Sequence, residues 1–368
     1  MESIDEAALE RYLAINLGGS GLENVERIEG GAVNETFGVS WNDREFVLRR
    51  PSPSDLAPGV LGDLRREHDI LDALEETDVP APRAILACED LTVIGSPFYL
   101  QERLDGDICA ETLPKRFQTP EHRHQLGLEV VEVLVRIHGV DTDRLQSVEL
   151  PTLTNASDVQ RSTELLEWAL ERTGEVRDLP RLRAASEWLA SNAPETESRT
   201  LVHGDYTSRN VAFEPITPPQ IQGVFDWEQS AIADPLTDLG FLCGLWHEED
   251  DPTPFDDDLV SQYSDHEQLQ NARGFYGEQT GPVAYSRHPD CATRRELVER
   301  YESLMGIQFS NERFYRAQAV HRVAAIVESF YRAHLADEPT PEWYAMTEVL
   351  VPAMATRFWQ VVDGDLPL

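Results

Sequence analysis

The sequence of 368 residues predicts an α+β fold with two lobes, a small lobe of antiparallel strands and a larger, mostly α-helical lobe. The length favours two units over a single compact core. The first hundred residues contain short strand-like runs separated by turn residues, whereas the chain after residue 104 has mainly helical periodicity. We therefore divide the chain into an N-terminal helix at 1–19, a small lobe at 20–103 and a large lobe at 104–368.

The small lobe is expected to contain five antiparallel strands, with one main helix after the third. Residues 24–50 form strand-like runs around a Gly-rich turn and a Trp-Asn-Asp turn, which predicts three strands. Residues 61–77 carry leucines at helical spacing, which predicts the helix. Two further strands are expected in residues 79–90 and 96–104.

The large lobe is expected to be built mainly from helices. They are expected at 121–140, 158–174 and 178–192, from 235 onward, and at 293–306, 311–335 and 341–362. Two short strand-and-loop pieces, at 201–213 and 221–229, interrupt them. Residues 248–286 are polar and acidic and contain several prolines and glycines, so we expect a surface insertion with weak helix content.

The charge of the chain excludes some classes of partner. It has 67 acidic and 31 basic residues, a formal net charge of −36, and Lys115 is its one lysine. A nucleic-acid-binding protein needs a basic face, so no nucleic-acid partner is expected. The acidic residues alternate with apolar ones, as on the solvated faces of folded helices. High salt screens the self-repulsion of such a surface, and we therefore expect a halophilic source, an archaeon.

Targeting and covalent features are sparse. No apolar run approaches the roughly 18 residues that a membrane span requires, and the acidic N-terminus does not resemble a secretory signal. We expect a cytoplasmic protein, monomeric or homodimeric, without a membrane partner. The four cysteines lie far apart in the sequence, which predicts free thiols rather than a zinc site or a disulfide framework.

The stretch LVHGDYTSRNVAF, residues 201–213, carries the most informative motif. Asp205 is followed five residues later by Asn210, and Asp226 comes at the end of the apolar run IQGVF. Phosphoryl transfer needs an acid that orients the attacking hydroxyl and oxygen ligands that hold magnesium against the phosphates. The alternative is a pair of surface turns capped by the same residue types. The ordered set of motifs favours a catalytic loop.

The pattern H-G-D-x-x-x-x-N followed by D-W-E resembles the aminoglycoside phosphotransferase family, relatives of the protein kinases, whose signatures H-R-D-x-x-x-x-N and D-F-G follow the same logic. The resemblance implies a protein-kinase-like fold. It also implies that Asp205 is the catalytic base and that His203 supports the loop.

The same resemblance assigns the metal ligands and a bracing residue. It implies that Asn210 and Asp226 bind magnesium and that Glu228 assists at the metal. Asp238, in the run DPLTDLG, matches a family aspartate that braces the catalytic loop through backbone hydrogen bonds.

The small lobe is expected to hold the nucleotide. Gly30 and Gly31 lie between the first two strands, where backbone N–H groups can approach phosphates closely. Such a pair alone is more often only a tight turn, but its position matches the Gly-rich loop of kinases. Asn34 matches a polar residue of that loop, whereas Val33 departs from the small hydroxyl residue found there.

The third strand ends with arginine where kinases carry a lysine. Arg49 stands at that position and Arg50 follows it; an arginine can bind phosphate bidentately but is bulkier than lysine. Glu67, on the following helix, is the expected ion-pair partner of Arg49, and a surface charge pair is the alternative. Backbone groups of Gln101, Glu102 and Arg103, in the connection between the lobes, are expected to contact the nucleotide base.

The sequence therefore predicts an ATP-dependent phosphotransferase with Mg²⁺ as cofactor, GTP being possible, that acts on a hydroxyl of a small molecule. The C-terminal helices and the runs VLRRPSP and CEDLTVIGSPFYLQERLDG resemble a subgroup that includes kinase domains fused to acyl-CoA dehydrogenases. That resemblance implies hydroxylated acyl-CoA thioesters rather than antibiotics as substrates. The acceptor pocket is expected among the helices after residue 105, the 150–195 region and the C-terminal helices. The alternative is a pseudokinase-like nucleotide-binding module, which the missing lysine favours and the intact acidic set opposes.

Overall fold

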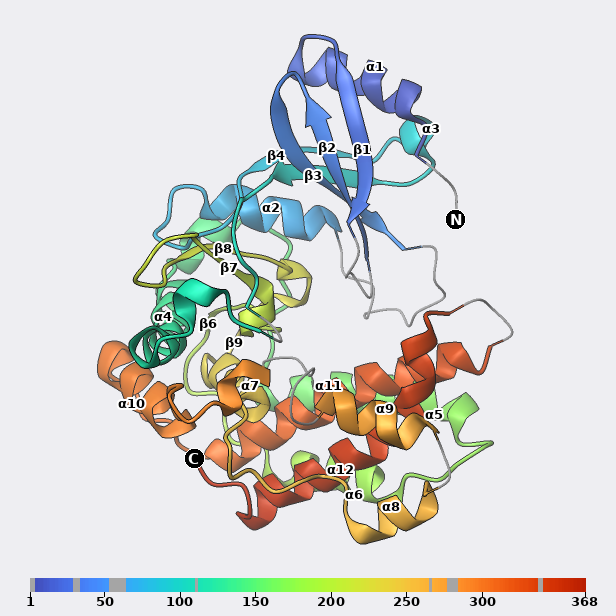
Figure 1. The fold of residues 1–368 in the computed structure, drawn as a ribbon, viewed down its shortest axis with the longest axis vertical. Coiled ribbons are helices and arrows are strands. Elements are labelled where there is room, and N and C mark those ends of the chain that lie inside the picture. Colours follow the sequence, from blue (N-terminus) through green and yellow to red (C-terminus); the bar gives the residue numbers. More distant parts are fainter. Residues whose placement is uncertain are drawn as a thin grey trace.

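The computed structural model describes residues 4–28, 34–52, 64–109, 112–264, 267–276, 284–336 and 340–368. A small lobe made largely of strands lies above a larger helical lobe (Figure 1). The expected α+β fold with two lobes is therefore confirmed. Within the described residues, no helix is both long and apolar enough to cross a lipid bilayer. The four cysteines are free and buried, as their spacing predicts.

One antiparallel sheet forms the small lobe, with the strand order β1-β2-β3-β5-β4. The strands are β1 (Leu22–Ile28), β2 (Asn34–Trp41), β3 (Arg44–Pro51), β4 (Ala84–Cys88) and β5 (Phe98–Glu102). Asn42 and Asp43 join β2 to β3, and both have positive φ, as a tight two-residue hairpin turn requires. The sequence predicted these five strands because their turn residues are local signals.

Helices cover both faces of this sheet. Along β5, Phe98 and Leu100 face the cluster that contains α1 (Glu6–Leu17), with the short α3 (Leu91–Ile94) beside it, because alternate side chains of a strand point to opposite faces. Tyr99 faces the other way, toward α2 (Leu64–Leu74) and the main core of the molecule. This second face brings Glu67 of α2, which is buried, beneath the end of β3.

The large lobe is mostly helical. Its helices are α4 (Pro120–His138), α5 (Asn155–Thr173), α6 (Pro180–Asn192), α7 (Leu236–Leu245), α8 (Asp257–Gln262), α9 (Glu267–Tyr276), α10 (Arg294–Met305), α11 (Glu312–His334) and α12 (Thr347–Asp363). Two small antiparallel sheets interrupt these helices along the chain. One pairs β6 (Thr200–Val202) with β9 (Ala231–Ala233), and the other pairs β7 (Val211–Phe213) with β8 (Ile221–Val224). Helix α11 is buried along most of its length and packs against α5, α7 and α12, so it connects the elements around the site.

The stretch 248–286 corrects one expectation from the sequence. Its described part contributes Phe255, Leu259, Tyr263 and Leu269 to the main hydrophobic core, and α9 packs against α12. The acidic residues dominate the composition of this stretch, but apolar side chains between them lie on the inner faces of α8 and α9. The described residues of 248–286 therefore pack onto the large lobe through α8 and α9.

Candidate active site

The loop that carries Asp205 begins where β6 ends. Gly204 turns the chain with a φ of +83°, a conformation that favours glycine, and a Cβ at this position would lie 2.3 Å from the carbonyl oxygen of Gln229. Glycine is therefore the one residue type that lets the loop pass this close to the neighbouring backbone. The turn places Asp205 directly after it.

Asp238, in the first turn of α7, anchors this loop through hydrogen bonds. Its carboxylate accepts the backbone N–H of His203 at 2.7 Å and that of Gly204 at 2.9 Å. It also accepts a hydrogen bond from Nε2 of His138 at 3.2 Å, and Nδ1 of His138 lies 2.7 Å from the hydroxyl of Tyr301. Burial alone would raise the pKa of Asp238, but the hydrogen bond and charge of His138 and the bonds from the loop keep the pKa below its usual value. Asp238 therefore stays ionised as an anchor for two loop N–H groups.

His203 links the loop to the strand that leads to Asp226. Its Nε2 donates to the carbonyl oxygen of Phe225 at 2.8 Å, and its Nδ1 accepts the backbone N–H of Asp205 at 3.2 Å. These partners assign the ring proton to Nε2, because Nδ1 has to accept. The buried ring also lies against Trp227, with 4.8 Å between ring centroids. His203 thus supports the loop and is not aimed at solvent.

Asp205 and Asn210 face one another within the loop. Nδ2 of Asn210 donates to the backbone oxygen of Asp205 at 2.8 Å and to its carboxylate at 2.9 Å. The amide nitrogen is thereby engaged, which leaves the amide oxygen of Asn210 as a possible metal ligand. Burial raises the pKa of Asp205, while the charge of Arg322 and the hydrogen bond from Asn210 oppose that rise.

Asp226 follows β8 and lies beside this pair. Its φ of 67° is left-handed, a region in which aspartate is enriched among residues other than glycine. The N–H of Phe225, just before it, donates to the backbone oxygen of Asn210 at 2.8 Å, so the two loops are joined directly. The structure thus brings Asp205, Asn210 and Asp226 together, as the spacing predicts.

Arg49 connects the two lobes at this point. Its Nη1 pairs with Glu67 of α2, and its Nη2 lies 2.5 Å from Oδ1 of Asp226 and 3.9 Å from Glu228. Arg50 instead pairs with Glu35, at 2.7 Å. Arg49 therefore faces the acidic residues of the large lobe.

Acidic side chains crowd around that single guanidinium. Burial raises the pKa of Glu228 well above its usual value, and the nearby Asp226 raises it further. Arg49 lowers the pKa of Asp226 in spite of burial. Among the described residues, no cluster of three or more histidine, cysteine or acidic side chains could hold a metal ion by itself. The carboxylate of Asp226 and the amide oxygen of Asn210 are oxygen donors of the kind that magnesium prefers.

Of the remaining residues predicted to bind the nucleotide, Asn34 lies in the site, whereas Gln101, Glu102 and Arg103 contact other residues of the small lobe. Asn34 reaches the site, because its Nδ2 donates to Glu228 at 2.5 Å across the lobes. The N–H of Glu102 is engaged by the carbonyl of Arg83 within the sheet, and the side chain of Gln101 accepts from Tyr99. Arg103 lies near exposed Glu26 and Glu45, each at 3.5 Å. Gly30, Gly31 and Val33 lie outside the described residues.

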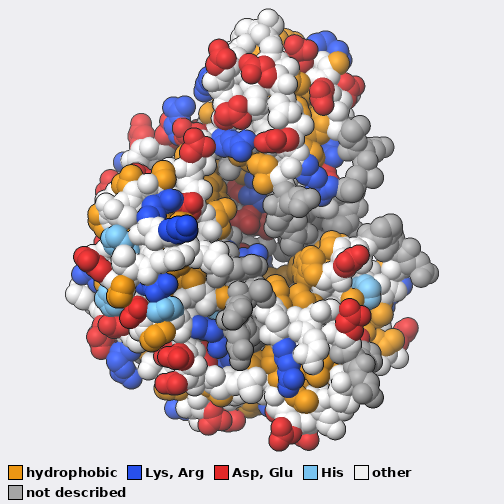
Figure 2. Space-filling model, viewed as in Figure 1, with side chains coloured by type: hydrophobic (Ala, Val, Ile, Leu, Met, Phe, Trp, Pro, Cys, Tyr) orange, Lys and Arg blue, Asp and Glu red, His pale blue; other side chains and the backbone are white. Residues whose placement is uncertain are grey.

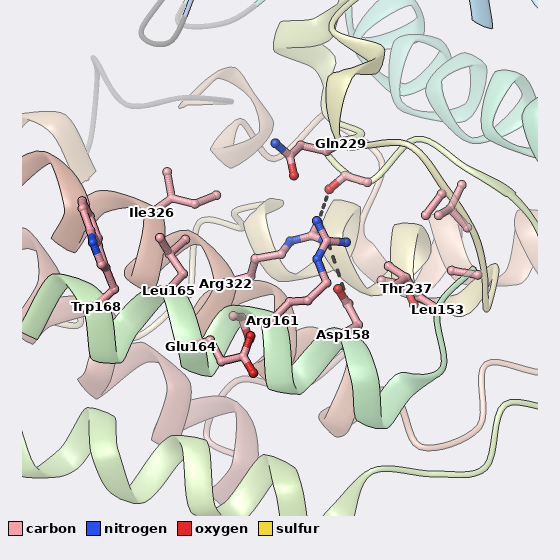
Figure 3. Close-up of a pocket in the computed structure, with 15 residues that line it drawn as sticks. Leu153, Asp158, Arg161, Glu164, Leu165, Trp168, Gln229, Thr237, Arg322 and Ile326 are labelled. Atoms are coloured by element: carbon pink, nitrogen blue, oxygen red, sulfur yellow. Dashed lines mark hydrogen bonds and ion pairs between the residues drawn. The ribbon is translucent and has the colours of Figure 1, made fainter. Parts of the chain in front are cut away.

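A hollow separates the lobes, and charged side chains are visible at its floor (Figure 2). Next to Gly204, a pocket of about 360 Å³ opens in the large lobe (Figure 3). It is lined by α5, α11, the β6–β9 sheet, Gly204, Gln229 and Thr237 of α7. Its wall carries both charged and apolar side chains, among them Asp158, Arg161, Glu164, Leu165, Trp168, Arg322 and Ile326.

Comparison with known proteins agrees with this geometry. Residues 24–275 match the APH family, described as the phosphotransferase enzyme family. The chain belongs to the APH phosphotransferase enzyme family. The resemblance drawn from the motifs is thus confirmed, and the protein is a kinase-type phosphotransferase. Over 369 aligned residues, covering 99% of the chain, it is 29% identical to "Acyl-CoA dehydrogenase family member 10" of Mus musculus. The chain spans 32% of the length of that relative.

Solved structures share the fold of this APH-family protein. A protein of Ralstonia eutropha assigned as an aminoglycoside phosphotransferase superposes with a TM-score of 0.72 at 24% identity, over 98% of this chain and 99% of that one. The aminoglycoside phosphotransferase APH(4)-Ia, in a ternary complex with AMP-PNP and hygromycin B, has a TM-score of 0.56 at 14% identity, over 97% and 98% of the two chains. The protein-kinase-like fold is therefore confirmed.

Several residues of the APH-family site could not be found by sequence reasoning. His138 of α4 supports Asp238, and Arg322 of α11 donates to the carbonyl oxygen of Gly204. Gln229 borders both the loop and the pocket. His138 and Arg322 lie on helices far from the motifs in sequence, whereas Gln229 directly follows the D-W-E motif, and none of the three is part of a spaced pattern. A charged residue within the otherwise buried face of α11 was the available signal for Arg322.

Proposed function

We propose that the protein transfers the γ-phosphoryl group of ATP to a hydroxyl group of a small molecule at Asp205. The observation that carries this proposal is the position of the Asp205 loop. On one side, Asp205 lies with Asn210 and Asp226, and on the other side the preceding residue, Gly204, lines the pocket of the large lobe. A hydroxyl held in that pocket would lie next to the groups that serve a nucleotide.

In the proposed reaction, Asp205 accepts the proton of the attacking hydroxyl group. The hydroxyl oxygen forms the new bond to the γ-phosphorus, and the bond from phosphorus to the β,γ-bridging oxygen breaks. ADP leaves with the electron pair of that bond. Burial favours this role, because the raised pKa of Asp205 makes its carboxylate a better proton acceptor than an exposed aspartate.

Asn210 and Asp226 would hold Mg²⁺ in this proposal. The donor set supports it: the nitrogen of Asn210 is engaged by Asp205, its oxygen is left, and Asp226 offers a partly exposed carboxylate. When bound, the ion would neutralise charge on the transferred phosphoryl group. Glu228 is held by Asn34, and its pKa, which burial and the neighbouring carboxylates raise, would fall when a cation binds beside it.

Arg49 is the proposed phosphate-binding residue of the small lobe. Among the described residues, its Nε has no hydrogen-bond partner although it is buried, and the same is true of Oδ1 of Asn34. Buried polar atoms are rarely left without a partner, so both atoms are available to a ligand between the lobes. Glu67 would keep the guanidinium in place, as a helix glutamate does for the lysine of kinases.

The pocket of the large lobe is the proposed acceptor site. Leu165, Trp168 and Ile326 give it an apolar wall, while Arg161 and Arg322 balance the charges of Asp158 and Glu164. An aminoglycoside is a polycation and would require an excess of acidic side chains. The balanced lining instead favours a metabolite with an apolar portion, such as a hydroxyacyl-CoA thioester.

A transfer assay with the purified protein in molar KCl tests this function. Labelled ATP, and GTP in parallel, would be offered with hydroxyacyl-CoA thioesters, free hydroxy acids and aminoglycosides, and phosphorylated products would be identified by mass spectrometry. We expect ATP-dependent phosphorylation of at least one hydroxylated acceptor, with aminoglycosides the poorest class. Mg²⁺-dependent phosphorylation of aminoglycosides alone would refute the proposed acceptor class.

A nucleotide-binding module without chemistry is the second candidate. The observation in its favour is that Arg49 replaces the usual lysine and is paired with both Glu67 and Asp226. Titration calorimetry that detects Mg²⁺-dependent nucleotide binding, together with no product from any acceptor, would favour this candidate over the enzyme.

A further inference from the structure

Arg322 reaches from α11 to the loop that carries Asp205. Its Nη2 donates to the carbonyl oxygen of Gly204, and its guanidinium carbon lies 4.6 Å from the centre of the Phe241 ring. Its Nη1 lies 3.9 Å from Asp158 of α5, and Gln318, one turn earlier on α11, donates to the same carboxylate at 2.6 Å. Figure 3 shows the side chain extending into the pocket. The guanidinium is therefore held in place by α5, α7 and α11 together.

The peptide group that joins Gly204 to Asp205 is bonded at both of its polar atoms. Its carbonyl oxygen accepts from Arg322, and its N–H donates to Nδ1 of His203 at 3.2 Å. The preceding N–H, that of Gly204, donates to Asp238. Because Gly204 has no Cβ to restrict its backbone, these side chains fix the orientation of the peptide.

We propose that Arg322 is a positioning residue for phosphoryl transfer, which fixes the peptide ahead of Asp205 from within the acceptor pocket. This inference rests on the proposed function of Asp205. Arg322 contacts Gly204, Asp158 and Phe241, all in the large lobe, whereas Arg49 and Asn34 approach from the small lobe. Loss of Arg322 should therefore change the step that Asp205 performs and leave nucleotide binding intact.

The size of the effect follows from the geometry that the reaction demands. A displacement of a catalytic group by about 1 Å can lower the rate roughly 100-fold. Without Arg322, the carbonyl of Gly204 loses its side-chain partner beside the pocket, and the peptide is then fixed only through its N–H. The Arg322→Met variant keeps much of the volume of the side chain but removes both its charge and its donors.

Arg332 offers a matched control on the same helix. It donates to the backbone carbonyl of Trp168 at 2.7 Å and lies 4.1 Å from the centre of the Trp168 ring. Arg322 and Arg332 thus make the same kinds of contact, a hydrogen bond to a backbone carbonyl and a stacking contact with an aromatic ring. A loss of stability is expected from Arg332→Met too, but no displacement of the Asp205 loop.

Hydrogen exchange and kinetics of the full chain test the inference together. In Arg322→Met, we expect faster amide exchange in the segment 201–213, a kcat lowered by about 100-fold and a nucleotide dissociation constant within about twofold of the parent. Arg322→Lys, which retains a charged donor, should recover part of the kcat. Arg332→Met should keep the exchange of 201–213 and, at saturating acceptor, the kcat of the parent; because Arg332 packs on Trp168 of the pocket wall, a change is expected only in the KM for the acceptor.

The two hypotheses fail in distinguishable ways. Absence of phosphoryl transfer by the parent protein would refute the proposed function, and the exchange measurement would still decide the role of Arg322. Unchanged exchange of 201–213 in Arg322→Met would overturn the inference. A parental kcat in that variant, or an equal fall of kcat in Arg332→Met, would overturn it as well.

Discussion

Replacement of Asp238 by asparagine tests how the Asp205 loop is held in place. The two side chains have nearly the same shape, but an asparagine amide has one acceptor atom where the carboxylate has two. In the parent, one carboxylate oxygen accepts from the N–H of His203 and from His138, and the other accepts from the N–H of Gly204. The amide nitrogen must replace one of these oxygens, so it will face at least one backbone N–H.

The cost follows from those contacts. His138 can adapt by presenting an unprotonated ring nitrogen, but a backbone N–H cannot. One buried N–H without an acceptor costs about 1–3 kcal/mol, and the loss of charge weakens the remaining bond by about 1 kcal/mol. We therefore expect Asp238→Asn to lower the free energy of unfolding by about 2–4 kcal/mol and to lower kcat roughly 100-fold through displacement of Asp205.

Urea unfolding, followed by tryptophan fluorescence in molar KCl, measures the stability, and the transfer assay measures kcat. Asp250→Asn removes the same charge at an exposed position and is the control. A free energy of unfolding within about 0.5 kcal/mol of the parent, combined with a parental kcat, would refute the reasoning about Asp238.

Three further predictions follow from burial, backbone conformation and charge. Gly204→Ala should destabilise the protein by at least about 1–2 kcal/mol and abolish transfer, because a Cβ would lie 2.3 Å from the Gln229 oxygen. Gly274→Ala, within α9 and with open space for a Cβ, should leave transfer unchanged and raise stability by up to about 1 kcal/mol in the same assays, because alanine favours a helix more than glycine does. Burial lowers the pKa of His321 to about 4, so the folded state binds fewer protons than the unfolded state below about pH 6.5, and stability is lost as the pH falls. Between pH 6.5 and 4, the parent should lose about 3 kcal/mol more than His321→Gln in urea unfolding, and equal losses would contradict this. Because the net charge is −36, the melting temperature should rise as KCl increases from about 0.1 M to 1 M, where the screening length falls from about 10 to 3 Å; a flat profile would argue against adaptation to high salt.

Local spacing explains why much of the fold and site could be predicted. Asp205 and Asn210 lie five residues apart in one loop, so their contact is set by the loop itself. The turn residues and periodicity of the small lobe determine its strands and α2 in the same way. Those elements then bring Arg49 to Glu67, a contact that could be expected once their order along the chain was known.

Contacts between distant segments could not be predicted in this way. Arg322 lies 118 residues from Gly204 in the sequence, and on a helix surface an arginine is usually only a solvated residue. The contact of Arg49 with Asp226 depends on how the lobes are placed relative to one another. In the described part of residues 248–286, the acidic composition concealed apolar side chains such as Leu269, which belongs to the main core, and its helix α9 packs against α12, far along the chain.

The kcat of the Asp205→Asn variant tests the central claim most directly. The measurement compares phosphoryl transfer by the variant and the parent at saturating nucleotide and acceptor, with the nucleotide dissociation constant measured in parallel. If Asp205 accepts the proton of the hydroxyl group, kcat should fall by about 10²–10⁴-fold while nucleotide affinity stays within about twofold of the parent. A variant that transfers phosphate at the parental rate would contradict the account.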